Sequence, residues 1–361
     1  MKVAFLLGSL NRGGTETLLL DVFRNADKAD FEFIGVHRKG GVLQQDFYTA
    51  EPKFFKLAPK FPFDFIYLLK LRKLLKKENV QIVHSQQFLD ALYSKIATLG
   101  TKIKVVQTYH SFEKESVLMK FIIKKTDKNF FVSNYQREYY IKKYSLKPEK
   151  QATVYNGISF KKFDKNFEKP VFLSENKNPK LAMIGNFVSV REHFTVCRFL
   201  KLLNEKTKKI EFYFIGKKDE KNPHLYDECA DFCAKNGLQN VHFLGSRNDV
   251  PAILQHIDAF IYSTDHDTFG IAVIEAIAAG LPVFVNDFEV MKEIADNGKF
   301  AILYKTKNET DLLDKFLLFL QNQNEYKENA KKNAIEIRKK FSIEEHLKVL
   351  ERNYFKLKNK N

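Results

Sequence analysis

The chain has 361 residues, of which 44% are hydrophobic and 14% aromatic, and it carries a formal net charge of +16. Because a single hydrophobic core usually stops growing at roughly 250 to 300 residues, this length predicts two domains. The abundance of Phe, Leu and Ile excludes a disordered chain, and no apolar run reaches the roughly 18 residues of a membrane span.

The first residues and the cysteines indicate the compartment. Near the start of the chain, charged residues and glycines interrupt the apolar segment too early for a signal peptide. Cys197, Cys229 and Cys233 are too few for a disulfide framework, which fits a reducing compartment. Cys229 and Cys233 are also spaced more widely than the ligand pairs of a zinc site, so we expect no metal. We therefore expect a cytoplasmic protein.

Positive charge is concentrated in the first half of the chain. Residues 1–165 carry 30 basic and 16 acidic side chains, a net charge of +14, whereas residues 166–361 carry 30 and 28. The segments 53–78 and 117–128 interleave lysines with aromatic residues, which is typical of contact with an anionic membrane at ~1 kcal/mol per basic residue. Alternatively, these helices are simply solvated, although lysine abundance alone would charge both halves alike. No recognition pattern for nucleic acid is present, so we expect no such partner.

Apolar runs alternate with longer helical patterns, which is typical of parallel βαβ units. In the first half we expect strands at 2–9, 31–38, 81–86, 104–110, 128–134 and 152–157. We expect helices there at 14–25, 63–77, 88–98 and 134–144. The polar stretch 158–180 has two prolines and no periodicity, which predicts an interdomain linker.

The same alternation begins again at residue 180. We expect strands at 180–187, 210–216, 241–246, 259–264, 281–287 and 300–305, and helices at 270–279 and 308–321. A last helix is expected from Ser342, because Ser342 and Glu345 form a capping box. The sequence thus predicts an α/β protein with two doubly wound parallel sheets, in domains at 1–165 and 166–340, followed by a helix within 341–361. Ligands of such sheets bind at the carboxyl ends of the strands, in a cleft that we expect between the two domains.

A glycine pair, Gly13 and Gly14, follows the first expected strand. Glycines let backbone N–H groups approach a ligand closely, and the start of the helix after them favours phosphate. The alternative is a simple tight turn. Neither the dinucleotide-binding nor the P-loop glycine pattern is present.

One loop and the helix after it carry the strongest chemical signal. Asp267 lies in the expected loop, and Glu275 lies on the helix that Gly270 begins. Backbone N–H groups of Phe269, Gly270 and Ile271 are expected to point out of the helix start and to suit an anionic ligand. Because carboxylates accept hydrogen bonds from neighbouring hydroxyls, this pattern is typical of a site for a sugar, a diphosphate and a ribose. The alternative is that Glu275 is a solvated helix residue and Asp267 a helix cap.

These residues resemble the motifs of the retaining GT-B fold glycosyltransferases of family 4, the group 1 glycosyltransferases, and the likeness covers nearly the whole chain. The family pattern begins with a glutamate followed by Gly-Phe-Gly, and Asp267 and residues 268–270 are similar to it. The pattern continues with a second glutamate in Glu-Ala-Met-Ala-x-Gly-x-Pro-Val, to which residues 275–283 are similar. The family's Gly-Gly-x-Glu, Asn-Gly-Ile and Phe-Leu-Gly are matched by 13–16, 156–158 and 243–245.

The resemblance implies an acceptor-binding N-terminal domain, a nucleotide-sugar-binding C-terminal domain and a last helix that crosses back to the first domain. It assigns Glu275 to the ribose of the nucleotide. It assigns the donor sugar to Asp267 and to the amides of Phe269, Gly270 and Ile271. Asp267 is one methylene shorter than the family's glutamate, which leaves the choice of donor sugar open.

The resemblance also assigns two cationic positions and a histidine. Arg191 stands where the family places a diphosphate-binding lysine, but Asn186 stands where it places an arginine, so a nearby base is expected to supply the missing charge. His110 matches a histidine close to the donor sugar, the alternative being a structural hydrogen bond. Arg247 is expected beside the nucleobase or as a plain loop residue, and Asp265 as a further acid of the donor loop.

Together these assignments imply a metal-independent retaining glycosyltransferase without a cofactor, in which Gly13 and Gly14 help to hold the diphosphate of a nucleoside diphosphate sugar. The basic first half favours an acceptor at the membrane, such as a polyprenyl-diphosphate glycan or lipopolysaccharide core, and an enzyme peripheral on the inner face of the plasma membrane. Such an enzyme would serve bacterial capsule, polysaccharide or lipopolysaccharide biosynthesis. Two alternatives stay open, a sugar-nucleotide epimerase or hydrolase on the same fold and a non-catalytic sugar-nucleotide-binding protein.

Overall fold

The computed structural model describes residues 1–50, 53–207 and 210–359. The chain divides into two compact units, Met1–Ser159 with Phe341–Asn361, which we call the N-terminal unit, and Phe160–Lys340, the C-terminal unit. The division lies before the boundary expected at residue 165. The reason is that Gln255 of the C-terminal unit donates hydrogen bonds to the carbonyl oxygens of Phe163 and Lys165.

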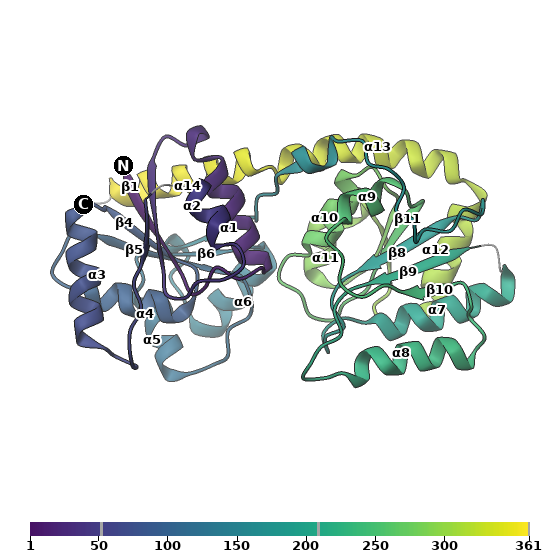
Figure 1. Ribbon diagram of the computed structural model, residues 1–361, viewed down its shortest axis with the longest axis horizontal. Helices are drawn as coiled ribbons and strands as arrows, with labels where there is room; N and C mark the ends of the chain where they lie inside the picture. The colour runs from purple at the N-terminus through teal and green to yellow at the C-terminus, as the bar shows by residue number, and fades with distance from the viewer. Residues whose placement is uncertain (51–52, 208–209, 360–361) are drawn as a thin grey trace. The chain divides into compact units, whose positions relative to one another are not determined.

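The N-terminal unit contains a seven-stranded parallel sheet in the order β3-β2-β1-β4-β5-β6-β7 (Figure 1). Its strands are β1 (Lys2–Leu7), β2 (Glu32–His37), β3 (Phe54–Lys56), β4 (Ile82–Ser85), β5 (Lys104–Tyr109), β6 (Lys128–Phe131) and β7 (Gln151–Thr153). Its helices are α1 (Gly14–Arg24), α2 (Gln44–Ala50), α3 (Phe65–Lys77), α4 (Phe88–Ala97), α5 (Val117–Lys125), α6 (Asn134–Tyr144) and α14 (Ile343–Lys358), with 3-10 turns η1 (Ala26–Lys28) and η2 (Pro148–Lys150). The short elements α2 and β3 have no counterpart among the expected strands and helices.

Strand β1 shows why this sheet is buried on both faces. Successive side chains of a strand point to opposite faces. Val3 and Phe5 join a core cluster that includes Tyr354 of α14, whereas Ala4 and Leu6 join a cluster with residues of α3 and α4. A parallel sheet covered by helices on both faces therefore reads as a continuous apolar run.

The last helix, α14, packs in the N-terminal unit, as the resemblance implied. The Oγ atom of Ser342 accepts a hydrogen bond from the backbone N–H of Glu345 at 3.1 Å, which confirms Ser342 as the expected capping residue. Near the other end of the helix, the hydroxyl of Tyr354 lies 2.5 Å from Nδ1 of the buried His84 on β4.

The C-terminal unit contains a six-stranded parallel sheet in the order β10-β9-β8-β11-β12-β13. Its strands are β8 (Lys180–Ile184), β9 (Glu211–Ile215), β10 (Val241–Phe243), β11 (Ala259–Tyr262), β12 (Val283–Asn286) and β13 (Ile302–Tyr304). Its helices are α7 (His193–Lys206), α8 (His224–Lys235), α9 (Val250–Gln255), α10 (Ile271–Ala278), α11 (Glu289–Ile294), α12 (Glu309–Gln321) and α13 (Gln323–Lys340), with 3-10 turns η3 (Phe160–Phe163) and η4 (Asp296–Gly298). The expected second doubly wound sheet is thus confirmed.

Each sheet has one position at which the strand order reverses. In the N-terminal unit this switch point lies between β1 and β4, and in the C-terminal unit it lies between β8 and β11. The loops that leave two such neighbours run in opposite directions and open a crevice at the carboxyl ends of the strands, where ligands bind. Within the described part of the chain, no helix is both long and apolar enough to cross a bilayer.

Candidate active site

An ion pair joins the two loops at the switch point of the C-terminal unit. Arg191 follows β8 and Asp267 follows β11, and Nη1 of Arg191 lies 2.7 Å from Oδ2 of Asp267. The hydroxyl of Tyr262, at the end of β11, donates to the same Oδ2 at 2.8 Å. The guanidinium carbon of Arg191 lies 4.5 Å from the centroid of the Tyr262 ring, a cation–π distance. The structure therefore brings together two residues that the sequence assigned to one site, and adds Tyr262, which the sequence did not indicate.

Burial decides the electrostatics of this pair. The side chains of Arg191 and Asp267 are only 17% and 15% exposed. Burial lowers the pKa of Arg191, and the carboxylate of Asp267 acts in the opposite direction. The Nε atom of Arg191 is buried and has no hydrogen-bond partner among the described residues. The pair thus holds a cation at the switch point with one donor unused.

The start of helix α10 faces the same loop. Oδ1 of Asp267 accepts hydrogen bonds from the backbone N–H groups of Thr268 at 2.7 Å and Phe269 at 3.3 Å. The amide of Phe269 is therefore engaged inside the loop, and the expectation that it is open to a ligand is wrong. Asp267 accepts these hydrogen bonds from residues before α10, so the helix-cap alternative for Asp267 is also wrong. Gly270 caps the helix in the left-handed conformation, with φ of +86°, and no side chain caps this end. The amides of Gly270 and Ile271 lie at a helix start, where N–H groups lack intrahelical acceptors.

Glu275 lies one turn further along α10. Its Oε1 atom is 2.5 Å from Nζ of Lys162 in η3, and its side chain is only 13% exposed. A solvated helix residue would be exposed, so that alternative for Glu275 is wrong. Lys162 was not predicted, because no local pattern connects η3 with α10.

A second cation lies beside the same loop. Nζ of Lys307, which follows β13, is 2.8 Å from Asp265 and 3.3 Å from Glu192. Glu192 directly follows Arg191 in the chain and Asp265 lies two positions before Asp267, so Lys307 contacts both loops that carry the switch-point pair. The sequence predicted a base near this loop without identifying it.

Two other predicted donor residues make local contacts. Oδ1 of Asn186, just after β8, accepts a hydrogen bond from the backbone N–H of Lys217 at 2.9 Å. Asn186 therefore fixes the loop after β9 and supplies no charge. Arg247 donates two hydrogen bonds to Asp249, at 2.9 and 2.6 Å, and lies 4.4 Å from the ring centroid of Phe172. These contacts with Asp249 and Phe172 fit the expectation that Arg247 is a plain loop residue.

In the N-terminal unit, the glycine pair lies at the first switch point. Gly13 caps helix α1, which begins at Gly14. A Cβ atom at Gly13 would lie 2.6 Å from Oε2 of Glu16, so a larger residue does not fit unless Glu16 moves. Burial raises the pKa of Glu16. The helix start expected to receive phosphate is thus approached by the carboxylate of Glu16.

The loop after β4 adds polar residues to this switch point. Nε2 of His110, after β5, lies 2.8 Å from Oε1 of Gln86, so a neutral His110 donates this hydrogen bond. Burial lowers the pKa of His110 to about 3, so the ring is neutral at pH 7. Nearby, Arg38 donates to Gln87 at 2.8 Å and to Asp90 at 2.7 Å, and Asp90 is almost fully buried. Arg38 and Asp90 were not predicted, since neither belongs to a recognisable motif.

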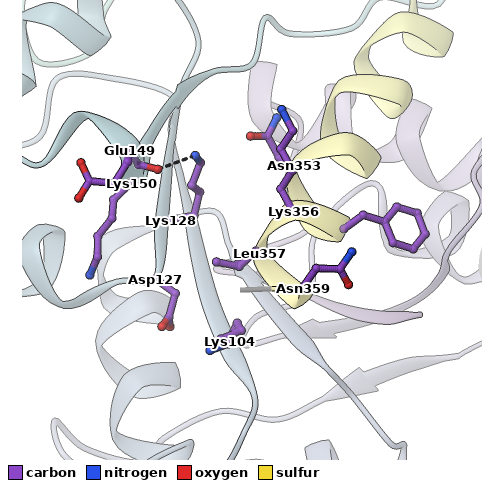
Figure 2. Close-up of a pocket in the computed structure, with 10 residues that line it drawn as sticks. Lys104, Asp127, Lys128, Glu149, Lys150, Asn353, Lys356, Leu357 and Asn359 are labelled. Atoms are coloured by element: carbon purple, nitrogen blue, oxygen red, sulfur yellow. Dashed lines mark hydrogen bonds between the residues drawn. The ribbon is translucent and has the colours of Figure 1, made fainter. Parts of the chain in front are cut away.

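A cavity of about 670 Å³ lies at the opposite edge of the N-terminal sheet (Figure 2). Lys104 and Lys128 begin β5 and β6 there, and Asn353 and Leu357 of α14 close the other side. Nζ of Lys128 donates to the backbone oxygen of Glu149 at 3.0 Å. Because this cavity lies at the amino ends of the strands, it is separate from the switch point.

The three cysteines do not form a second site. Cys197, Cys229 and Cys233 are free and buried in the core of the C-terminal unit. Over the described residues, no group of three or more His, Cys, Asp or Glu side chains is arranged to hold a metal ion.

Comparisons with known proteins give the context of this geometry. A family model described as "Glycosyl transferases group 1" matches residues 164–337, and one described as "Glycosyltransferase Family 4" matches residues 12–162. The chain is 27% identical over 315 residues to the N,N'-diacetylbacillosaminyl-diphospho-undecaprenol alpha-1,3-N-acetylgalactosaminyltransferase of Campylobacter jejuni, covering 80% of this chain and 81% of the relative. It is 28% identical over 239 residues to the UDP-Gal:alpha-D-GlcNAc-diphosphoundecaprenol alpha-1,3-galactosyltransferase of Escherichia coli, covering 61% of each protein.

Among solved structures, HepE of Anabaena in complex with UDP has a TM-score of 0.85 to this chain at 14% identity, covering 99% of this chain and 100% of that one. At this identity the likeness concerns the fold. It confirms the two-domain fold predicted from the sequence.

Proposed function

Because the chain belongs to the group 1 glycosyltransferases, with a family 4 domain in its first half, we propose that it transfers a sugar from a uridine diphosphate sugar to a hydroxyl of a lipid-linked glycan, with retention of configuration and without a metal. The observation that carries the site assignment is the Arg191–Asp267 pair at the switch point beside the start of α10. UDP as the donor nucleotide is supported by the UDP complex of HepE and by the UDP-galactose named for the E. coli relative. Both named relatives act on diphosphoundecaprenol acceptors, which supports a lipid-linked acceptor.

The donor diphosphate is proposed to lie over the start of α10. The amides of Gly270 and Ile271 and the positive end of the helix favour the negative charge that grows on the diphosphate as it leaves. Arg191 supplies a fixed cation beside them, and its unused Nε donor is available once the loop adjusts around a ligand. Lys307 is proposed to supply the charge that the uncharged Asn186 lacks.

Glu275 is proposed to hold the ribose. A carboxylate offers about four acceptor positions, so Glu275 can receive two vicinal hydroxyls while Lys162 keeps its contact. That contact fixes the side chain in one orientation, which lowers the entropy cost of binding the ribose.

The proposed transfer step is the front-side displacement that the family resemblance implies. The acceptor oxygen bonds to the anomeric carbon on the face from which the diphosphate oxygen departs. The acceptor proton passes to the departing diphosphate, so no enzyme base is consumed. Asp267, already bound to Arg191 and Tyr262, is proposed to orient the donor sugar through the oxygen that faces the loop amides. The neutral His110 is proposed to hydrogen-bond the donor sugar.

The acceptor is proposed to be presented at an anionic membrane surface, on the cytoplasmic side. Residues 1–165 hold a net charge of +14, which attracts anionic headgroups within about a Debye length. Such attraction weakens with salt, so sedimentation with anionic vesicles at low and high ionic strength tests it.

Turnover of an Arg191 variant tests the donor site. Arg191→Met is expected to lower the rate of UDP release in the presence of acceptor by about 10²- to 10³-fold, as for other groups that stabilise developing charge. Arg24→Met is the control, because Arg24 pairs with Asp46 in the N-terminal unit and is not part of the donor loop. NMR of the product reports the anomeric configuration, and a donor-only incubation detects hydrolysis or epimerisation. Equal rates for Arg191→Met and the control would reject the assigned site.

A further inference from the structure

Exposed apolar side chains gather on the N-terminal unit. Among the described residues of the C-terminal unit, the large apolar side chains that are exposed lie apart from one another in the sequence, at Val171, Phe194, Leu318 and Ile335. In the N-terminal unit, eight exposed large apolar side chains lie in or just before the first turns of α3 and α5. They are Phe61, Phe63, Phe65, Ile66, Leu69, Val117, Leu118 and Phe121. A clustered apolar surface of this kind marks an interaction site, whereas single exposed apolar residues need no explanation.

Helix α3 changes character along its outer face. Near its start the exposed residues are Phe65, Ile66 and Leu69, and from Lys70 onward they are lysines. The inner face carries the buried residues Tyr67, Leu68, Leu71 and Leu75. The fold therefore uses only the inner face, and the exposed aromatic end is not required for the core.

Helix α5 repeats this arrangement. Val117, Leu118 and Phe121 are exposed at its start, and Lys124 and Lys125 are exposed at its end. Its buried residues are Met119, Ile122 and Ile123. Both helices thus begin with exposed apolar residues and end with exposed lysines.

The topology aligns the two apolar starts. Helix α4 packs against both α3 and α5, so the three helices lie side by side on one face of the sheet (Figure 1). Helix α3 follows β3 and precedes β4, and α5 follows β5 and precedes β6, in a sheet whose strands are all parallel. Both helices therefore run opposite to the strands and begin at the carboxyl edge of the sheet. Their apolar starts lie at that edge, and their lysines lie toward the other.

The turn before α3 holds an exposed aromatic residue in an unusual backbone conformation. Phe63 has φ of +62° and is exposed. A bulky residue in this left-handed region is strained, and strained residues cluster at functional and ligand-binding sites. Asp64 then caps α3, accepting hydrogen bonds from Tyr67 and Lys60, which fixes Phe61, Phe63 and Phe65 on a rigid turn.

We propose that the starts of α3 and α5 insert their aromatic side chains into the interface of an anionic bilayer, while the lysines along both helices contact lipid phosphates. This inference deepens the proposed function and rests on it for the lipid-linked acceptor. Lys70, Lys73 and Lys124 make no ion pair with any described residue, so their charge is available to anionic lipid. Aromatic residues beside lysines are typical of helices that lie in the membrane interface, whereas lysine is depleted in the cores of protein interfaces.

Vesicle binding by the full chain, without any substrate, tests the proposal. Phe65→Ser and Phe121→Ser are each expected to weaken binding to phosphatidylcholine–phosphatidylglycerol vesicles by about tenfold, at low and at high salt alike. Lys73→Gln is expected to weaken binding about fivefold at low salt and to have little effect at high salt, since charge is screened. Ile335→Ser, at an equally exposed apolar residue of the C-terminal unit, is the matched control and should bind as wild type.

The outcomes separate this surface from the active site. Unchanged vesicle binding by the Phe65→Ser/Phe121→Ser double variant, with an unchanged melting curve, would overturn the proposal. A change of oligomeric state in the double variant, measured by light scattering without lipid, would overturn it in favour of a protein interface. Transfer to a short-chain acceptor in detergent should survive in the double variant, and a loss of all transfer in wild type would count against the proposed function alone.

Discussion

Replacing Asp267 by alanine tests the ion pair at the switch point of the C-terminal unit. The carboxylate receives four donors, namely Nη1 of Arg191 at 2.7 Å, the hydroxyl of Tyr262 at 2.8 Å, and the amides of Thr268 at 2.7 Å and Phe269 at 3.3 Å. Its removal leaves a guanidinium that is 17% exposed without its anion. Breaking a buried pair costs about 3 to 5 kcal/mol, and partial exposure places this loss near ~3 kcal/mol.

A double-mutant cycle isolates the pair from the other contacts. Arg191→Met/Asp267→Ala removes both charges, so it should lose only about 1 to 2 kcal/mol for the remaining hydrogen bonds. Asp267→Ala is therefore expected to be less stable than the double variant, and the double variant should lose less than the sum of the two single losses.

Urea denaturation followed by circular dichroism suits this measurement, because the chain contains no Trp. Hydrogen exchange of the amides in β11 and α10 assigns the loss to the C-terminal unit. A loss of less than about 1 kcal/mol in Asp267→Ala, or a double variant that loses the sum of the two single losses, would refute the reasoning.

Three further predictions concern stability and membrane contact. Burial lowers the pKa of His193 to about 3; since an unfolded histidine takes up a proton below about pH 6.5, His193 alone should contribute about 2 kcal/mol to the fall in the free energy of unfolding from pH 7 to pH 5, and urea titrations of His193→Gln should show a fall smaller by that amount. Gly270→Ala should lower the melting temperature more than Gly237→Ala, because both glycines have positive φ but only at Gly270 does a Cβ approach Met291, at 2.8 Å; equal shifts would show that the contact is without effect. Phe63→Asn should stabilise the protein by about 1 kcal/mol, because Asn tolerates positive φ, and yet weaken vesicle binding; tighter binding would contradict the insertion of this turn.

The sequence predicted those parts of the fold that depend on local patterns. The strand expected at 259–264 and the helix expected at 270–279 contain β11 and α10. They could be predicted because the apolar periodicity of a buried strand or helix depends only on residues close together in the chain. The strands end earlier than expected, since the residues after them form the loops of the candidate site. The short elements α2 and β3 carry too few residues for a periodic signal.

The contacts within the site were not predictable in the same way. Arg191 and Asp267 are 76 positions apart, and Lys162 and Glu275 are 113 positions apart. A resemblance assigns residues to roles, but which side chains pair is decided by the order of strands in the sheet. Asn186 illustrates this, since its partner, the amide of Lys217, follows the neighbouring strand β9.

Recognition of the ribose by Glu275 is the central claim, and calorimetric titration of two nucleotides tests it most directly. Wild-type protein is expected to bind UDP about 10- to 100-fold more tightly than 2′,3′-dideoxyuridine diphosphate, because only UDP offers two hydroxyls to the carboxylate. Glu275→Ala should bind the two nucleotides with nearly equal affinity, whereas the control Glu289→Gln, at an exposed acid on α11, should keep the wild-type preference. Equal affinity of the wild-type protein for the two nucleotides, or an undiminished preference in Glu275→Ala, would contradict the account.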